Sequence, residues 1–361
     1  MIQFEECIIH IGTMKTGTTT LQEFFRHNKS NLAKRGFLFP TTLGKHTHEL
    51  LTALTLDNKK KDAQKKILVI NGINFLNFHD EITNLFEQEI KTENLSNMLL
   101  SAESMSLLLT SDEEIQHLKK FLDKYCKTFK IIIYLRPQHE LGISNFSTNC
   151  KQGATKKKFF LENDIKKGFF DYEKLLDRWE RVFGFENIIP RIFSKDELHE
   201  GDIKKDFCNI FGWNWNKFHD IKNVNESINA EAQLFLIEIN KFIPRFVGNK
   251  LNPYREDLAD LVFVGNEGKG LLPTRKDTEE FLAMYEESND KVRKKWFPER
   301  NGLFKFDLSK YPEKPDMDTD YKFAFKIFAK VWKLKQDQLF ALRKENEQLK
   351  KLLEKIGREN N

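Results

Sequence analysis

The sequence predicts an α/β fold, in which a parallel sheet is flanked by helices and a long coiled-coil helix follows toward the C-terminus. Short apolar segments alternate with helical patterns over about the first 200 residues, and this alternation is typical of a parallel sheet covered on both sides. One segment, IIIYL at 131–135, is apolar without interruption, as expected of a strand buried on both faces. Near the C-terminus a heptad pattern replaces the alternation.

Four segments are predicted as strands. The first, CIIHI at 7–11, precedes a turn rich in glycine and threonine, and a helical pattern follows from Thr19 to His27. The apolar run at 97–103 ends in polar residues, and IIPRIF at 188–193 resembles a further strand beyond IIIYL. Each of these runs has the length and composition of a strand in a parallel sheet.

Helices are predicted between and after these strands. Ser111 and Glu114 have the spacing of a capping box, which begins a helix leading to Tyr125. The segment 172–183 places its apolar side chains on one helical face, and 225–289 is mostly helical. We expect one domain over residues 1–310.

The C-terminal part has a different character. A polar linker with two prolines is expected at 311–321, and a coiled-coil helix at 322–357. Asn346 at an a position favours a two-stranded pair, in which Glu345 can reach Lys350 of a parallel partner. The alternative is a helix packed on its own domain. Eight of the ten a and d positions are apolar; the ten are Phe325, Phe328, Trp332, Lys335, Leu339, Leu342, Asn346, Leu349, Leu353 and Ile356.

Composition narrows the function classes. The net charge of +5 results from 59 basic and 54 acidic residues, so it does not favour a nucleic-acid partner. The four cysteines lie far apart and the histidines complete no metal spacing, so we expect reduced thiols and no metal site. No signal peptide and no apolar run long enough to span a bilayer is present in this sequence. We therefore expect a cytoplasmic protein without a transmembrane segment.

The segment HIGTMKTGTTTLQ at 10–22 has the outline of a phosphate-binding loop. Gly12 and Gly17 have the separation of a P-loop, but Thr18 stands where a nucleotide triphosphatase has lysine. Lys15 lies midway round the loop instead. Backbone N–H groups can still bind a phosphate here, and the hydroxyl donors are those of Thr16, Thr18, Thr19 and Thr20.

This loop resembles the P-K-T-G-T-T loop of sulfotransferases that use 3′-phosphoadenosine 5′-phosphosulfate (PAPS). The residues that match run from Lys15 to Thr19, and Met14 replaces the usual proline. In that family the lysine contacts the oxygen between phosphate and sulfuryl group. The resemblance implies a P-loop-like parallel sheet, PAPS as the donor and 3′,5′-ADP as the product.

A second element of the family is an apolar strand that ends in arginine, with a serine eight residues later. Arg136 follows IIIYL, and Ser144 stands eight residues further on. The resemblance implies that both hold the 3′-phosphate, and an arginine fork suits a terminal phosphate. Weaker similarity to bacterial members that sulfate carbohydrates extends over roughly residues 7–305.

The resemblance implies transfer of a sulfuryl group to a hydroxyl or amine, with a carbohydrate or glycolipid as the expected acceptor. Lys15 would stabilise the leaving phosphate. A hydroxyl acceptor needs a general base, and the candidates are Glu103, at the end of the 97–103 run, and His48. Two alternatives stay open: a P-loop kinase that uses ATP, and a non-catalytic scaffold held as a homodimer by the coiled coil.

Overall fold

The computed structural model describes residues 4–44, 46–74, 76–221, 227–248, 250–255, 258–314 and 321–359. The chain forms two compact units. Unit 1 consists of residues 1–141, 161–224 and 279–307, and unit 2 of residues 142–160, 225–278 and 308–361. Most of the expected linker at 311–321 lies outside the described residues, so the linear domain boundaries stay a prediction.

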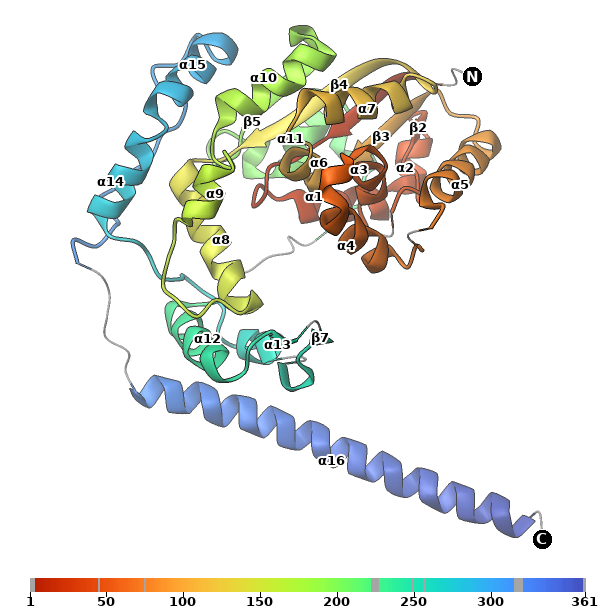
Figure 1. Cartoon of the computed structure of the whole chain (residues 1–361), viewed down its shortest axis with the longest axis vertical. Helices are drawn as coiled ribbons and strands as arrows, with labels where there is room; N and C mark the ends of the chain where they lie inside the picture. Colours follow the sequence, from red (N-terminus) through yellow and green to blue (C-terminus); the bar gives the residue numbers. More distant parts are fainter. Residues whose placement is uncertain are drawn as a thin grey trace. The chain divides into compact units, whose positions relative to one another are not determined.

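Unit 1 contains a five-stranded parallel sheet (Figure 1). Its strand order is β2-β3-β1-β4-β5, and each neighbouring pair is parallel. The predicted α/β class is therefore confirmed. The two-residue β2 was not expected, because such a short segment leaves no pattern in the sequence. The bounds are β1 Phe4–His10, β2 Phe37–Leu38, β3 Asn97–Ser101, β4 Cys126–Leu135 and β5 Ile188–Ile192.

Alternate side chains of the strands point to opposite faces, and each face is covered by helices. Ile9 belongs to the apolar cluster on one face, and Ile8 to the cluster on the other. The first face packs against α3 Glu49–Thr55, α4 Lys61–Asn71, α5 Phe78–Thr92, α6 Glu103–Leu108, α7 Asp112–Leu122, α10 Tyr172–Phe183 and α15 Glu286–Trp296. The second packs against α1 Thr18–His27, α2 Lys29–Ala33 and α11 Ile203–Ile210.

The strand order creates a switch point beside β1. From β1 the chain crosses to β2 on one side, whereas from β4 it continues to β5 on the other. Ligands of open α/β sheets bind at such a point, outside the carboxyl ends of the strands. The loop after β1 and the residue after β4 both lie at this edge.

Two local predictions are confirmed, and two elements have other ends than the sequence predicted. Ser111 and Glu114 form the capping box of α7, and α10 buries its apolar face through residues that include Trp179. Strand β4 begins five residues before the apolar run, because Cys126 already pairs with Phe4 of β1. Helix α7 ends at Leu122 rather than leading as far as Tyr125.

Unit 2 is mostly helical, as predicted, with one antiparallel hairpin that was not. Its core joins side chains of α8, α12, α13 and α16, among them Phe146, Leu236 and Ile327. Helix α8 begins in unit 1 and ends in unit 2, and α14 passes from unit 2 into unit 1. The bounds are α8 Gln138–Gln152, α12 Ala230–Phe242, β6 Phe246–Val247, β7 Lys250–Leu251, α13 Leu258–Phe263, α14 Arg275–Ala283 and α16 Tyr321–Glu359.

The remaining short elements are α9 Glu162–Lys166 and the 3-10 helices η1 Asn58–Lys60, η2 Phe185–Asn187, η3 His199–Gly201, η4 Trp215–Lys217 and η5 Pro253–Arg255. All four cysteines are free and buried. Within the part of the chain that the structure describes, no helix is long and apolar enough to cross a bilayer.

Candidate functional site at the carboxyl edge of the sheet

The loop between β1 and α1 is a tight backbone turn. Gly12, Lys15 and Gly17 all have positive φ, at 60°, 63° and 73°. A Cβ atom on Gly12 would lie 2.6 Å from Cγ2 of Thr18 and 3.2 Å from Cβ of Glu103, so only glycine fits there. Lys15 adopts a conformation that costs energy for a residue with a side chain. The surrounding contacts therefore determine the turn and hold Lys15 in it.

The loop ends at the N-terminus of α1. Gly17 is the N-cap residue, no side chain caps the helix, and its first turn carries no acidic residue. The backbone N–H groups of this turn and the helix dipole favour an anion. Lys15 belongs to the same loop, two residues before the N-cap.

The four threonines expected to donate to a phosphate differ in what their hydroxyl groups do. Oγ1 of Thr16 donates to the carbonyl of Thr13 at 2.6 Å, and Oγ1 of Thr18 donates to Oε2 of Glu103 at 2.5 Å. Thr20 is buried, whereas Thr19 is exposed. The Thr16 and Thr18 hydroxyl protons are thus used inside the protein, and these two residues would contact a phosphate through their backbone N–H groups.

Arg136 connects the end of β4 to the loop. Its Nη1 donates to the carbonyl oxygen of Lys15 at 2.9 Å, and its Nε lies 3.3 Å from Oε2 of Glu140. A second connection runs from Thr13, whose Oγ1 donates to the carbonyl of Tyr134 at 2.7 Å. The structure therefore brings the Arg136 guanidinium to the loop backbone at Lys15. That the two residues bind one nucleotide stays a prediction.

Ser144, the other residue expected at the 3′-phosphate, lies on a different unit from Arg136. It lies on α8 and is half-buried, and its carbonyl accepts a hydrogen bond from Thr148. Arg136 belongs to unit 1 and Ser144 to unit 2. The contact of Ser144 with the 3′-phosphate stays a prediction.

Glu103 lies at the end of β3, on the other side of β1. It is the first residue of α6 and is half-buried. The hydrogen bond from Thr18 aims one oxygen of its carboxylate at the beginning of α1. The ends of β1, β3 and β4 thus contribute Lys15, Glu103 and Arg136 to one edge of the sheet.

His48 does not have the surroundings of a general base. The side chain is 1% exposed. Its Nδ1 accepts from the backbone N–H of Ser101 at 2.7 Å, so Nε2 carries the proton and donates to the carbonyl of Pro40 at 2.8 Å. Burial lowers the pKa of His48 to about 4. Its one lone pair is already bonded to Ser101, two residues before Glu103, which suggests a structural role beside the candidate base.

His10 is a polar residue of this region that the sequence reasoning missed. It is fully buried in β1, and its Nδ1 lies 2.8 Å from Oγ of Ser101. Burial lowers the pKa of His10 to about 3, so the ring is neutral. The available signal was a histidine inside the apolar run CIIHI. Ser101 is therefore held from two sides, by His10 through its hydroxyl and by His48 through its backbone.

The segment 48–60 holds α6 at further points. Oγ1 of Thr52 lies 2.8 Å from Oγ of Ser104, next to Glu103. At the other end of α6, Nζ of Lys60 donates to the carbonyl of Leu108 at 2.6 Å. We call these two contacts, together with the bond between His48 and the backbone of Ser101 at the end of β3, the α6 brace.

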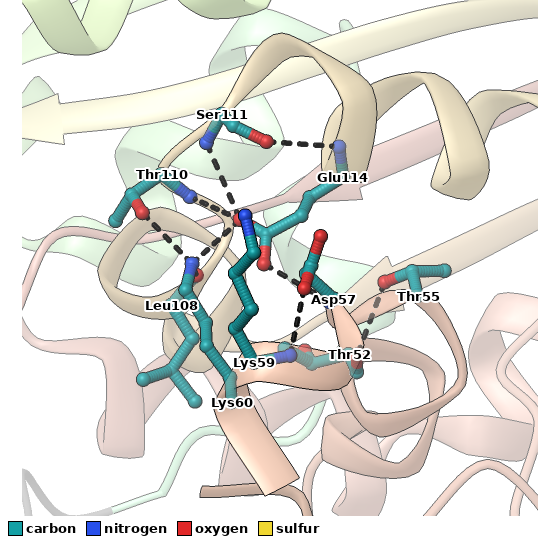
Figure 2. A network of polar contacts seen from close by, with 9 residues as sticks. All are labelled: Thr52, Thr55, Asp57, Lys59, Lys60, Leu108, Thr110, Ser111 and Glu114. Carbon is teal, nitrogen blue, oxygen red and sulfur yellow. Dashed lines mark hydrogen bonds and ion pairs between the residues drawn. The ribbon is translucent and has the colours of Figure 1, made fainter.

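Figure 2 shows how the Lys60 end of the α6 brace is fixed. The Glu114 carboxylate is 1% exposed and pairs with Nζ of Lys60 at 2.6 Å. It also accepts from the backbone N–H groups of Asp57 at 3.1 Å and Thr110 at 2.9 Å. The capping box revealed Glu114 in the sequence, but nothing there indicated its ion pair with Lys60.

Comparison with known proteins gives limited information on function. No protein-family profile matches the chain. It is 26% identical over 211 residues to an uncharacterized protein of Archaeoglobus fulgidus, a match that covers 56% of this chain. The chain spans about half the length of that relative, since 55% of the relative is covered.

Among solved structures, a sulfotransferase from Alicyclobacillus acidocaldarius is similar with a TM-score of 0.39 and 14% sequence identity. The match covers 61% of this chain and 85% of the other. A similarity of this size carries no functional conclusion. In the described ranges, no three or more His, Cys, Asp or Glu side chains are grouped so that they could hold a metal ion.

Proposed function

We propose that this protein is a sulfotransferase that transfers a sulfuryl group from PAPS to a hydroxyl or amine of an acceptor. The observation that carries the proposal is the bond from Arg136 to the carbonyl of Lys15. It joins the two motifs that resemble the family's phosphate-binding elements. They come from chain segments more than a hundred residues apart, and a chance resemblance in either one would not require them to meet.

The residues present fit such a donor. The uncapped first turn of α1 and the Lys15 ammonium offer donors for the 5′-phosphate side. Arg136, which is 25% exposed, offers its guanidinium charge to the 3′-phosphate. The donor supplies the sulfuryl group, and its 3′,5′-ADP part is the leaving group.

The chain's own residues then act in two ways. Lys15 stabilises the negative charge that develops on the leaving phosphate oxygen, an effect that a fixed cation supplies without reorganisation. Glu103 accepts the proton of the attacking hydroxyl as general base. Because both ring nitrogens of His48 bond to the backbone, Glu103 is the stronger candidate for the base.

For the acceptor, we propose a carbohydrate or glycolipid, which rests on the sequence resemblance to bacterial members alone. A screen of acceptors with labelled PAPS identifies the class. Transfer of label to a glycan hydroxyl is the expected result, and transfer to no acceptor in a panel of glycans, glycolipids, phenols and amines would contradict the enzymatic proposal.

Nucleotide binding separates this function from its alternatives. We expect 3′,5′-ADP to bind tightly in a calorimetric titration without magnesium, and Lys15→Ala to weaken that binding at least about tenfold, the loss of one charged contact. Lys34→Ala, an exposed lysine at the end of α2, is the matched control. Tight Mg-ATP binding with indifference to 3′,5′-ADP would favour a kinase, and no nucleotide binding would favour a scaffold.

A further inference from the structure

Helix α16 packs on unit 2 through one face of its first turns. Ile327 is fully buried in the core of unit 2, and Val331 packs partly against it. Nζ of Lys330 donates to the carbonyl of Gly265 at 3.3 Å. Helices α12 and α13 both contact α16. This face fastens the beginning of α16 to its own chain.

A second face of α16 stays uncovered. We call it the heptad stripe; its described residues are Phe325, Phe328, Trp332, Lys335, Leu339, Leu342, Asn346 and Leu349. Phe325 is 71% exposed and Trp332 58% exposed. With about 100° between successive residues, Ile327 and Val331 lie roughly a quarter turn away from the stripe. Packing on unit 2 therefore does not use the heptad pattern that the sequence shows, and Leu353 and Ile356 lie outside the side chains that the structure describes.

The later turns of α16 leave their side chains exposed. Every side chain from Asp337 to Lys350 is exposed, including Leu342 at 56% and Leu349 at 49%. Isolated helices are only marginally stable in water, because most helical stability in proteins comes from packing of an apolar face. A long helix with an apolar stripe thus needs a partner over these turns.

We propose that the heptad stripe packs against the same stripe of a second copy of this chain, in a parallel two-stranded coiled coil. A 3.5-residue repeat of apolar residues fits an identical helix, since each side chain then meets its equivalent across the axis. Asn346 at an a position would pair with the partner's Asn346, which fixes register and favours two strands. Glu345 at g faces Lys350 at e of a parallel partner, so the charges are complementary as well.

This proposal does not depend on the enzymatic activity, and light scattering of the full-length chain tests it. We expect the mass of two chains at micromolar concentration. Leu342→Lys places a charge in the stripe and is expected to give the mass of one chain. Phe340→Lys is the matched control, because Phe340 is 67% exposed on the same turn but lies at position b, outside the stripe.

The two variants distinguish self-association through the stripe from association through another surface. A wild-type chain with the mass of one chain would overturn the proposal and point to a different partner for α16. A dimer that survives Leu342→Lys, or one that Phe340→Lys abolishes equally, would place the interface elsewhere.

Disulfide trapping tests the direction of the two helices. In a parallel dimer Asn346→Cys brings two thiols together, and mild oxidation is expected to convert most of the protein to a covalent dimer. Lys344→Cys, at the outward-facing f position, is expected to give little. The native cysteines are buried and do not compete. Absence of crosslinking for Asn346→Cys in a dimeric sample would rule out the parallel, in-register arrangement.

Discussion

The two sides of β1 are built in different ways. On the β4 side, the loop is held by contacts that the motif residues make themselves, from Arg136 to Lys15 and from Thr13 to Tyr134. On the β3 side, Glu103 reaches the loop through Thr18, but its own position depends on the distant segment 48–60. The residues proposed to bind the phosphates can therefore be recognised from short motifs, whereas the placement of the candidate base depends on contacts that no motif shows.

We therefore expect the two sides of β1 to affect different quantities, nucleotide affinity on the β4 side and kcat on the β3 side. Residues on the β4 side are proposed to hold the nucleotide, and residues on the β3 side to act on the acceptor proton. Substitutions on the β3 side are then expected to lower kcat while nucleotide affinity stays unchanged.

The largest effect is expected for Glu103→Gln. Loss of a general base lowers kcat by about 10²-fold or more. The affinity for 3′,5′-ADP is expected to stay within about threefold, because glutamine can still accept the hydrogen bond from Thr18. Steady-state kinetics with labelled PAPS and calorimetry give the two numbers. A matched His48→Gln variant is expected to keep most of the activity; the reverse ranking would make His48 the base.

The next largest effect is expected on the unfolding free energy, which depends on pH through His48. Because burial lowers the pKa of His48 to about 4, the folded protein keeps this ring neutral, whereas the unfolded chain protonates it below about pH 6.5. The stability that the neutral His48 ring contributes to the folded state is fully present above pH 6.5 and is lost as the pH falls toward 4. Between about pH 7.5 and pH 5, the wild type is expected to lose about 2 kcal/mol of unfolding free energy through His48.

Urea unfolding at the two pH values measures this loss. His48→Gln retains a donor for Pro40 and an acceptor for Ser101, yet it does not titrate. Its loss of stability between the two pH values is expected to be about 2 kcal/mol smaller than that of the wild type. Equal losses in both proteins would show that His48 is not held neutral by burial.

The smallest effect is expected for Thr52→Val, which removes one hydrogen bond of the α6 brace at nearly constant shape. A net hydrogen bond is worth about 1 kcal/mol, so kcat is expected to fall about fivefold with unchanged affinity for 3′,5′-ADP. The control is Thr55→Val on the same helix, whose hydroxyl bonds only carbonyls of α3 itself. A similar fall in both variants would mean that the brace does not position Glu103.

The contrast between local motifs and long-range contacts also explains how much of the structure could be predicted from the sequence. Four strands of the five-stranded sheet and the loop were predicted because apolar runs, the two glycines and the residues around Lys15 are local patterns. The capping box of α7 was visible for the same reason. The bonds of Ser101 with His10 and His48, and the pair of Lys60 with Glu114, join residues 53 to 91 positions apart, and no periodicity records such contacts.

His48 illustrates the limit most clearly. Its position after FLFP suggested a base by resemblance, but its chemistry is set by Pro40 and Ser101, which the fold brings to its two ring nitrogens. For α16 the sequence left two alternatives open, a coiled coil and packing on its own domain. Ile327 and Val331 show that the helix packs on unit 2 through a face that the heptad pattern does not include.

The most direct test of the proposed phosphate grip compares 3′,5′-ADP with 5′-AMP, which lacks the 3′-phosphate. In calorimetric titrations without magnesium, the wild type is expected to bind 3′,5′-ADP about 100-fold more tightly, the value of charge-assisted bonds to a phosphate. Arg136→Ala is expected to remove most of this preference. It is expected to weaken 5′-AMP binding less than 3′,5′-ADP binding, and only through the lost bond to the Lys15 carbonyl. A wild-type protein that binds the two nucleotides equally, or an Arg136→Ala variant that keeps the full preference, would contradict the assignment of Arg136 and with it the proposed sulfotransferase site.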